Sequence, residues 1–165
     1  MTTPSEPPEP TGLSEDDEFR VDLLTLAEWA LIGPDGRVTL GNAVTTTVQV
    51  PAVPAGLPPL YLVASVAAPP AWAGHQAELA VRALDAAGRP VAADPLVSGV
   101  AAFPPGAQDA AAPPRLQLAL QITGLPVQSP GRVRFVLSLA GDELGEVGLE
   151  VRVAPPSSGS SRPTL

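Results

Sequence analysis

The sequence predicts an all-β protein, a two-layer antiparallel β-sandwich of about seven or eight strands with an immunoglobulin-like or jelly-roll-like arrangement. One observation is that the 22 prolines cluster in turns, breaks and the two ends of the chain. Because proline lacks an N–H and cannot lie in a central ladder, these clusters mark the ends of strands. The other observation is that the intervening segments alternate apolar and polar residues, which places one face of each strand on a core.

The first segment, residues 19–32, fits two patterns. Phe19, Val21 and Leu23 alternate as in a strand, whereas the apolar residues from Leu23 to Leu31 also recur at helical spacing, with Asp22 as a potential N-cap. We favour a strand with a bulge or a short helical turn after it, because a Gly-Pro-Asp-Gly turn and a Val/Thr-rich strand over residues 37–50 follow. Trp29 lies in the apolar run and is expected in the core.

Four further segments follow in the middle of the chain. Residues 60–67 are nearly all apolar and predict a buried strand, and residues 76–84 alternate more weakly. Residues 89–102 are interrupted by Pro90 and Pro95, which predicts an edge strand or a loop. In residues 115–123, leucines and an isoleucine alternate with Arg and Gln, which predicts another strand with one wet face.

The clearest pattern is a hairpin near the C-terminus, with strands over residues 132–139 and 146–153 and a turn over residues 140–143. The side chains expected in the core are Val133, Phe135, Leu137, Leu139, Val147, Leu149, Val151 and Val153. The alternate positions, which include Arg134 and Val136, are expected to face water.

Charge and composition divide the chain into three parts. Residues 1–18 carry six acidic residues and no base, are rich in proline, and predict a disordered acidic tail. Residues 19–154 form the expected β-sandwich domain, and residues 155–165 predict a second disordered tail rich in Ser and Pro. The net charge is −8, and all nine bases are scattered arginines. This distribution argues against nucleic acid and against an anionic membrane surface as partners.

Cysteine is absent, which excludes disulfides and thiolate chemistry. The N-terminal residues 1–18 are acidic and rich in proline, whereas a signal peptide begins with basic residues and an apolar run. We therefore expect a cytoplasmic protein. No phosphate-binding glycine motif, nucleophile elbow or usual zinc-ligand set is present, so we expect no cofactor, no metal and no catalytic residue.

Two residues are weak candidates for binding a ligand or a partner, namely Trp72 and His75, which share one loop. A loop tryptophan beside a histidine can stack on a sugar or anchor a protein, although Trp72 more often caps the open end of a sandwich and His75 more often is a plain polar residue at a strand start. Asp142, Glu143 and Glu146 around the last turn are a weaker candidate for calcium, because turns also attract acidic residues for backbone reasons.

The order of these features resembles an uncharacterised family of small bacterial β-sandwich proteins, a domain of unknown function. The resemblance rests on Val21-Asp22-Leu23-Leu24, Ala27-Glu28-Trp29-Ala30, the segment from Asp35 to Gly41, and the segment from Pro130 to Phe135. Arg37 stands where lysine is usual in that family, and Val133 stands where an aromatic is common. The resemblance implies a fold and no site residues.

A well-patterned domain without a reactive cluster predicts a non-enzymatic interaction or assembly module, with a protein partner or a second copy of the chain as its target. The alternative is a module that binds a carbohydrate or another small molecule at the end loop near Trp72. An enzyme has the least support from the residues.

Overall fold

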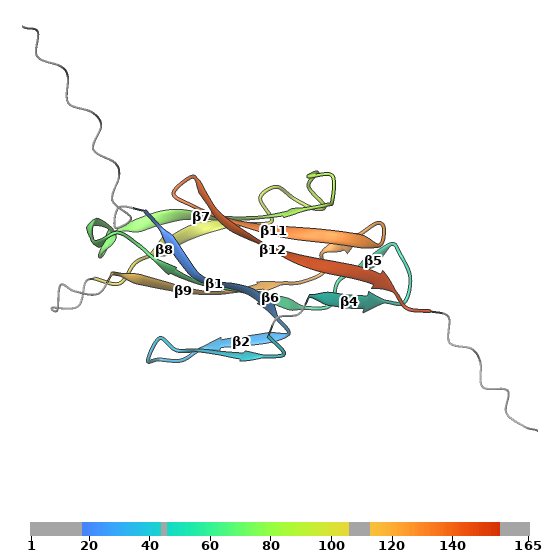
Figure 1. Cartoon of the computed structure of the whole chain (residues 1–165), viewed down its shortest axis with the longest axis horizontal. Helices are drawn as coiled ribbons and strands as arrows, with labels where there is room; N and C mark the ends of the chain where they lie inside the picture. The colour runs from blue at the N-terminus through green and yellow to red at the C-terminus, as the bar shows by residue number, and fades with distance from the viewer. Residues whose placement is uncertain (1–17, 44–45, 106–112, 156–165) are drawn as a thin grey trace, which may run out of the picture.

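The computed structural model describes residues 18–43, 46–105 and 113–155, so the predicted tails lie almost wholly outside the described residues. The described chain is built from strands, as predicted, with one short 3-10 turn, η2 (Pro70–Trp72). Two sheets form the sandwich (Figure 1). Their strands in chain order are β1 (Arg20–Ala27), β4 (Thr47–Val50), β6 (Leu60–Ala67), β7 (Gln76–Leu84), β8 (Val97–Ala102), β9 (Arg115–Ile122), β11 (Gly131–Leu139) and β12 (Asp142–Val153).

One sheet has the order β1-β6-β9 and the other has the order β4-β12-β11-β7-β8. Neighbouring strands are antiparallel except for β4, which runs parallel to β12. The all-β sandwich prediction is therefore confirmed, and the expectation of purely antiparallel pairing is wrong at this one pair. The reason lies in the segment 37–50, which splits into two strands that pair with different partners instead of forming one long hairpin strand.

Two small ladders accompany the main sheets. The strands β2 (Trp29–Ile32) and β3 (Val38–Gly41) form a separate antiparallel hairpin, and β5 (Ala55–Gly56) pairs with β10 (Pro126–Val127). Figure 1 shows the hairpin on the outer side of the three-stranded sheet, so that this part of the molecule has a third layer. The hairpin contacts β6 and β9.

The main core lies between the two sheets and contains the inward rows of β6, β7, β9, β11 and β12. Phe135, Leu137 and Leu139 are fully buried there, and so are Leu149 and Val151, which confirms the register predicted for the C-terminal hairpin. Val153 departs from it and is 40% exposed at the end of β12. The connecting turn comprises only Ala140 and Gly141, both with positive φ, because β12 already begins at Asp142.

Val136 was expected to face water and is instead buried, although it does not belong to the main core. It lies on the outer face of the five-stranded sheet between Arg82 and Glu146, its cross-strand partners. Two ion pairs flank it. The guanidinium of Arg82 lies 3.0 Å from the carboxylate of Glu143, and that of Arg134 lies 2.9 Å from the carboxylate of Glu146. The long aliphatic stems of these charged side chains cover the valine while their heads stay in water.

The ambiguous first segment is a strand, and the helical alternative is wrong. A bulge between Val21 and Leu23 shifts the register of β1 against β6, as the favoured interpretation predicted, and Glu28 separates β1 from β2. Hydrogen bonding to β6 along its whole length decides in favour of the strand, because it satisfies the backbone groups that a helix would satisfy internally.

The segment 89–102 contains an edge strand, as predicted. After a single bridge at Pro90, the chain forms β8, which pairs only with β7 and ends the five-stranded sheet. The strand β6 is buried along its length, as predicted, because it is central in its sheet and both of its faces are covered.

Candidate interaction site

The hairpin β2–β3 owes its shape to its turn. The backbone N–H of Gly33 donates to the carbonyl of Arg37 at 2.8 Å, and the carboxylate of Asp35 accepts from the N–H of Arg37 at 3.1 Å. Gly36 has a φ of 74°, a conformation that glycine adopts without steric cost. These interactions close the hairpin with local residues alone, as is typical of turns rich in Gly, Pro and Asp.

The base of the hairpin is closed by hydrogen bonds of Glu28. Its backbone N–H donates to the carbonyl of Gly41 at 3.2 Å, and its carboxylate accepts from the side-chain amide of Asn42 at 2.6 Å. These bonds join the two ends of the hairpin to each other directly after the end of β1 at Ala27. The hairpin is thus closed by hydrogen bonds at its base and at its turn.

One face of the hairpin covers the outer side of the three-stranded sheet. Ala30 pairs with Leu40 across the hairpin, and both are partly buried. Beneath the hairpin, Ala27 and Val63 are fully buried although neither belongs to the main core between the sheets. Since the hairpin contacts β6 and lies on this side, it is the layer that excludes water from them.

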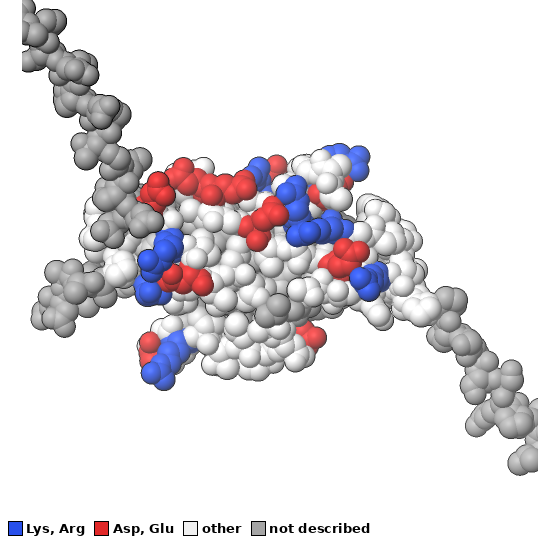
Figure 2. Space-filling view, viewed as in Figure 1, with Lys and Arg blue, Asp and Glu red and all other residues white. Residues whose placement is uncertain are grey.

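The opposite face of the hairpin exposes large apolar side chains. Trp29 and Leu31 alternate with Ala30 along β2 and are 49% and 63% exposed. Trp29 was expected in the core, and that expectation is wrong, because β2 leaves the sandwich and only one of its faces has a layer to pack against. In Figure 2 the hairpin is largely free of charge, with acidic and basic residues only toward its ends.

The indole ring of Trp29 lies against Gly41, the residue opposite it in the ladder. A side chain at position 41 would overlap the atoms of this ring. Because Gly41 has no side chain, the indole packs directly on its backbone, and about half of the surface of Trp29 remains exposed to water. A half-exposed tryptophan packed on the backbone is the kind of side chain that dominates the binding energy of protein interfaces.

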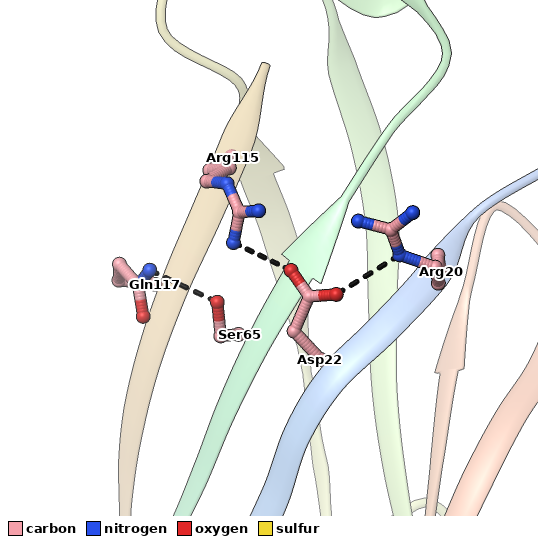
Figure 3. Close-up of polar contacts among 5 residues, drawn as sticks. All are labelled: Arg20, Asp22, Ser65, Arg115 and Gln117. Atoms are coloured by element: carbon pink, nitrogen blue, oxygen red, sulfur yellow. Dashed lines mark hydrogen bonds and ion pairs between the residues drawn. The ribbon is translucent and has the colours of Figure 1, made fainter. Parts of the chain in front are cut away.

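A polar cluster occupies the bulge of β1 (Figure 3). Asp22 forms ion pairs with Arg20, at 2.9 Å, and with Arg115 of β9, so it links the two outer strands of the sheet across β6. The hydrogen bond from Arg20 is the main cause that lowers the pKa of Asp22 below its usual value, and the charge of Arg115 acts in the same direction. Next to it Gln117 donates to Ser65 at 3.0 Å. The carboxylate is ionised and already paired, which suits a structural role and not proton transfer near neutral pH.

At one end of the sandwich Trp72 lies in an aromatic cluster. Its ring centroid is 5.1 Å from that of Phe19 and 6.1 Å from that of Phe103, and it is half-buried, which is the position of a residue that caps the end. His75 is exposed directly before β7 and hydrogen-bonds through its backbone to Trp72 and Phe103. The two predicted candidates thus share one loop, but only Trp72 belongs to the aromatic cluster, and His75 is exposed.

A hollow of about 540 Å³ adjoins Trp72 and is lined by Glu18, Phe19, Trp72, Ala140, Asp142, Glu143 and Leu144. It unites Trp72 with two of the three acidic residues near the last turn and does not include His75. Glu146 lies elsewhere, paired with Arg134. Among the residues that the structure describes, no group of three or more His, Asp or Glu side chains is placed to hold a metal ion.

The sequence suggested Trp72 but missed Glu18 and Phe19 beside it, because the residues directly before β1 and the 70–75 loop meet only in the fold. It also did not predict that Leu31 and Trp29 are exposed to water. The sequence carries no signal for this exposure, because the run from Trp29 to Ile32 is apolar at every position and assigns neither face to a core. In the described part of the chain, no helix has the length and apolar character that crossing a membrane requires.

Comparisons with known proteins give a family and distant structural similarity. A protein-family model described as a family of unknown function (DUF6941) matches residues 22–152. No curated protein matches the sequence significantly. Among solved structures, the alkylpurine DNA glycosylase AlkC of Pseudomonas fluorescens, bound to DNA containing an abasic site analog, is 13% identical with a TM-score of 0.42 over 82% of this chain and 30% of that chain.

The β-glucosidase of Listeria innocua in complex with isofagomine is 12% identical, with a TM-score of 0.45 over 83% of this chain and 17% of that chain. The chain thus spans less than a third of either protein. Similarity at this level carries no functional argument for this chain.

Proposed function

Because this chain belongs to DUF6941, a family of unknown function, membership supplies no activity, and we propose from its surface that it is a non-enzymatic β-sandwich that binds a protein partner through the β2–β3 hairpin. The observation that carries the proposal is the outward face of the hairpin, where Trp29 and Leu31 are 49% and 63% exposed. Exposed tryptophan and leucine cost free energy in water, which a partner with a complementary apolar surface would recover.

The way in which the hairpin is built supports this role. Its turn and its base are hydrogen-bonded, and Trp29 is seated on Gly41, so little conformational freedom would be lost on binding. The carboxylate of Asp22 is paired with two arginines and the side chain of His75 is exposed, and neither arrangement supplies an activated nucleophile or a general base.

The test compares two substitutions of equally exposed apolar residues. Leu31→Glu adds a charge to the hairpin, and Val100→Glu adds one to β8, where Val100 is 65% exposed. Wild-type and variant proteins would be used to capture partners from the native host, with mass spectrometry as the readout and circular dichroism to confirm folding. We expect a partner that is recovered by wild type and Val100→Glu and lost by Leu31→Glu.

Recovery of the same partner by Leu31→Glu would contradict the proposal. Loss with Val100→Glu alone would assign binding to the edge strand β8 instead. If the partner is a second copy of the chain, light scattering would show a mass above that of the monomer for wild type and the monomer mass for Leu31→Glu.

A second candidate function is binding of a carbohydrate or a similar polar small molecule in the hollow beside Trp72. The specific observation in its favour is that Phe19 and Trp72 line the same hollow as Glu18, Asp142 and Glu143. An aromatic platform can stack on a sugar ring while carboxylates accept hydrogen bonds from its hydroxyls. A thermal shift with a panel of sugars that vanishes in Asp142→Asn would support this candidate, and no shift with any sugar would count against it.

A further inference from the structure

The strand β8 ends the five-stranded sheet, and in the described part of the chain its outer edge pairs with no other strand. It forms an antiparallel ladder with β7 that has no register shift. The backbone groups along an unpaired edge can bond to another strand, so proteins commonly blunt such edges with charges, prolines, bulges or short strands. None of these features is found in β8, whose six residues are Val97-Ser98-Gly99-Val100-Ala101-Ala102.

The other outer strands of the two sheets are blunted. The strand β4 has only four residues and runs parallel to β12. The strand β1 carries a bulge and the ion pair of Arg20 with Asp22, and β9 begins at Arg115, which pairs with the same carboxylate. Among these outer strands, β8 is thus the one whose edge is uncharged, regular and free of proline.

Every second residue of β8 directs its backbone groups to the free edge. Phe103, which follows β8, donates its N–H to the carbonyl of His75 at 2.9 Å, so its backbone faces β7. Because this direction alternates along a strand, Ser98, Val100 and Ala102 direct their N–H and carbonyl groups away from β7. All three of these residues are exposed.

Gly99 lies in the middle of β8, where the described chain imposes no need for glycine. Its φ is not in the left-handed region, and an added Cβ would meet no atom within 4 Å. A glycine inside a strand weakens the strand, and it often marks a site where another backbone approaches closely. A second strand beside β8 accounts for this glycine, because the missing side chain leaves room for the residue opposite.

We propose that β8 pairs with β8 of a second copy of this chain as an antiparallel strand, in a two-fold register with Val100 opposite the second copy's Val100. Ser98 then lies opposite the second copy's Ala102, and Gly99 lies opposite the second copy's Ala101. Each of the three residues at the free edge forms a hydrogen-bonded pair in this register, so their backbone groups are satisfied. The two five-stranded sheets join into one continuous sheet.

A second copy suits this edge better than a flexible peptide. Its β8 is already an ordered strand, so pairing costs little conformational entropy, whereas a free peptide has to be ordered on binding. The contact is also isologous, which means that a two-fold axis brings the same surface of both copies together and each edge is its own complement. The two strands therefore need no further partner to satisfy each other.

Charge does not oppose this pairing, although the chain has a net charge of −8. Glu78 of β7 lies beside Val100, and three strand spacings, about 14 Å, separate it from the second copy's Glu78. This distance exceeds the Debye length of about 8 Å at physiological ionic strength, so their repulsion is largely screened. At the axis itself, Val100 is 65% exposed in the single chain and is covered by the valine opposite.

Light scattering of the full-length chain over a range of concentrations tests the pairing. Val100→Glu places two like charges opposite each other at the two-fold axis, and Val100→Thr is the matched control, because threonine keeps the branched shape. We expect the mass to rise from one chain to two with concentration for wild type and Val100→Thr, and to stay at one chain for Val100→Glu. Circular dichroism shows whether the variants are folded.

The hairpin β2–β3 lies on the outer side of the three-stranded sheet, away from β8 in the other sheet. Leu31→Glu should therefore still form the dimer. This variant separates self-association through β8 from the partner binding proposed for the hairpin.

Cross-linking tests the register and does not depend on the folding of Val100→Glu. The chain has no cysteine, so Ser98→Cys and Ala102→Cys each introduce a single thiol. The Cα atoms of a hydrogen-bonded antiparallel pair lie about 5.5 Å apart, a distance that a disulfide spans. A mixture of the two variants should form a mixed disulfide. Each variant alone should not, because its thiol lies about 14 Å from that of the second copy.

Val153→Cys, at an exposed valine of β12, is the control and should not cross-link to Ser98→Cys. A dimer in which Ser98→Cys cross-links to itself as readily as to Ala102→Cys would show that the strands do not pair in this register, and the proposal would be wrong.

Three other outcomes bear on the occupant of the edge. A mass of one chain for wild type at every concentration would overturn the proposal. Binding of an added peptide with the sequence of residues 97–102 to that single chain would show that the edge takes a segment of another protein. A mass of one chain for Leu31→Glu, together with a mass of two chains for Val100→Glu, would assign self-association to the hairpin and overturn the pairing through β8.

Discussion

The indole of Trp29 rests on Gly41, which faces it across the β2–β3 hairpin, and the absence of a side chain at position 41 is what makes room for the ring. The position of the Trp29 side chain, the proposed binding residue, therefore depends on residue 41 being glycine. A single substitution of Gly41 can test this dependence.

Gly41→Ala should displace the indole. The backbone of Gly41 suits any residue, so the added methyl group acts only by overlapping the ring, and we expect a loss of about 1 kcal/mol in the free energy of unfolding. Gly99→Ala is the control, because an added Cβ there meets nothing within 4 Å. Fluorescence in a Trp72→Phe background should show a red shift for Gly41→Ala and none for Gly99→Ala. An unshifted spectrum in both would mean that Gly41 does not seat the ring.

The two tryptophans should differ in what they contribute to stability. Trp72→Ala removes a ring packed against Phe19 and Phe103 and should cost about 2 kcal/mol, less than a fully buried tryptophan. Trp29→Ala should cost about 1 kcal/mol or less and should mainly weaken partner binding. Urea unfolding of the two variants tests this ranking, and the reverse order would place Trp29 in the stabilising core.

His75→Ala should leave stability within about 0.5 kcal/mol of wild type, because the imidazole is exposed and the loop is held by backbone hydrogen bonds from the same residue. The same variant should retain partner binding. Complementation of a deletion strain at matched protein abundance measures its role in the cell, and failure of the well-folded variant to complement would indicate chemistry at the 72–75 loop.

Neighbouring residues of β11 should respond in opposite ways to truncation. Phe135→Ala opens a cavity in the main core and should cost about 3–5 kcal/mol. Arg134→Ala removes an ion pair with Glu146 in which both side chains are partly exposed, and should cost about 1 kcal/mol or less. Denaturant midpoints of the two variants provide the comparison, and similar values would contradict the observed register of the strand.

The ion pairs of Asp22 should make stability depend on pH in acid. The folded-state pKa of Asp22 lies below the usual value of about 3.9, so the native state favours the ionised form. Its contribution is complete above that usual value and is lost as the pH falls through the lowered folded-state pKa. The stability difference between wild type and Asp22→Asn should therefore be present at neutral pH and shrink at strongly acidic pH. Glu78→Gln, at an exposed site without an ion pair in the described chain, is the control.

Much of the fold followed from the sequence alone. Alternation in residues 132–139 and 146–153 predicted the β11–β12 hairpin and the burial of Phe135, and Pro90 and Pro95 predicted an edge strand or a loop where β8 lies. These features depend on local constraints, because the period of two assigns a face to each residue and proline removes a donor wherever it stands.

The tertiary structure decided what surrounds each of those faces. Alternation could not show that β2 leaves the sandwich and exposes Trp29, that β4 joins β12 in parallel, or that ion pairs cover Val136. The pattern also could not predict that Phe19 lies beside Trp72, or that the side chain of Arg132 lies over Gly148 and not toward Glu150. The pattern along a strand specifies which side chains share a face, whereas the layer that packs on that face is supplied by residues distant in the chain, and only their contact determines whether an apolar side chain becomes core or surface.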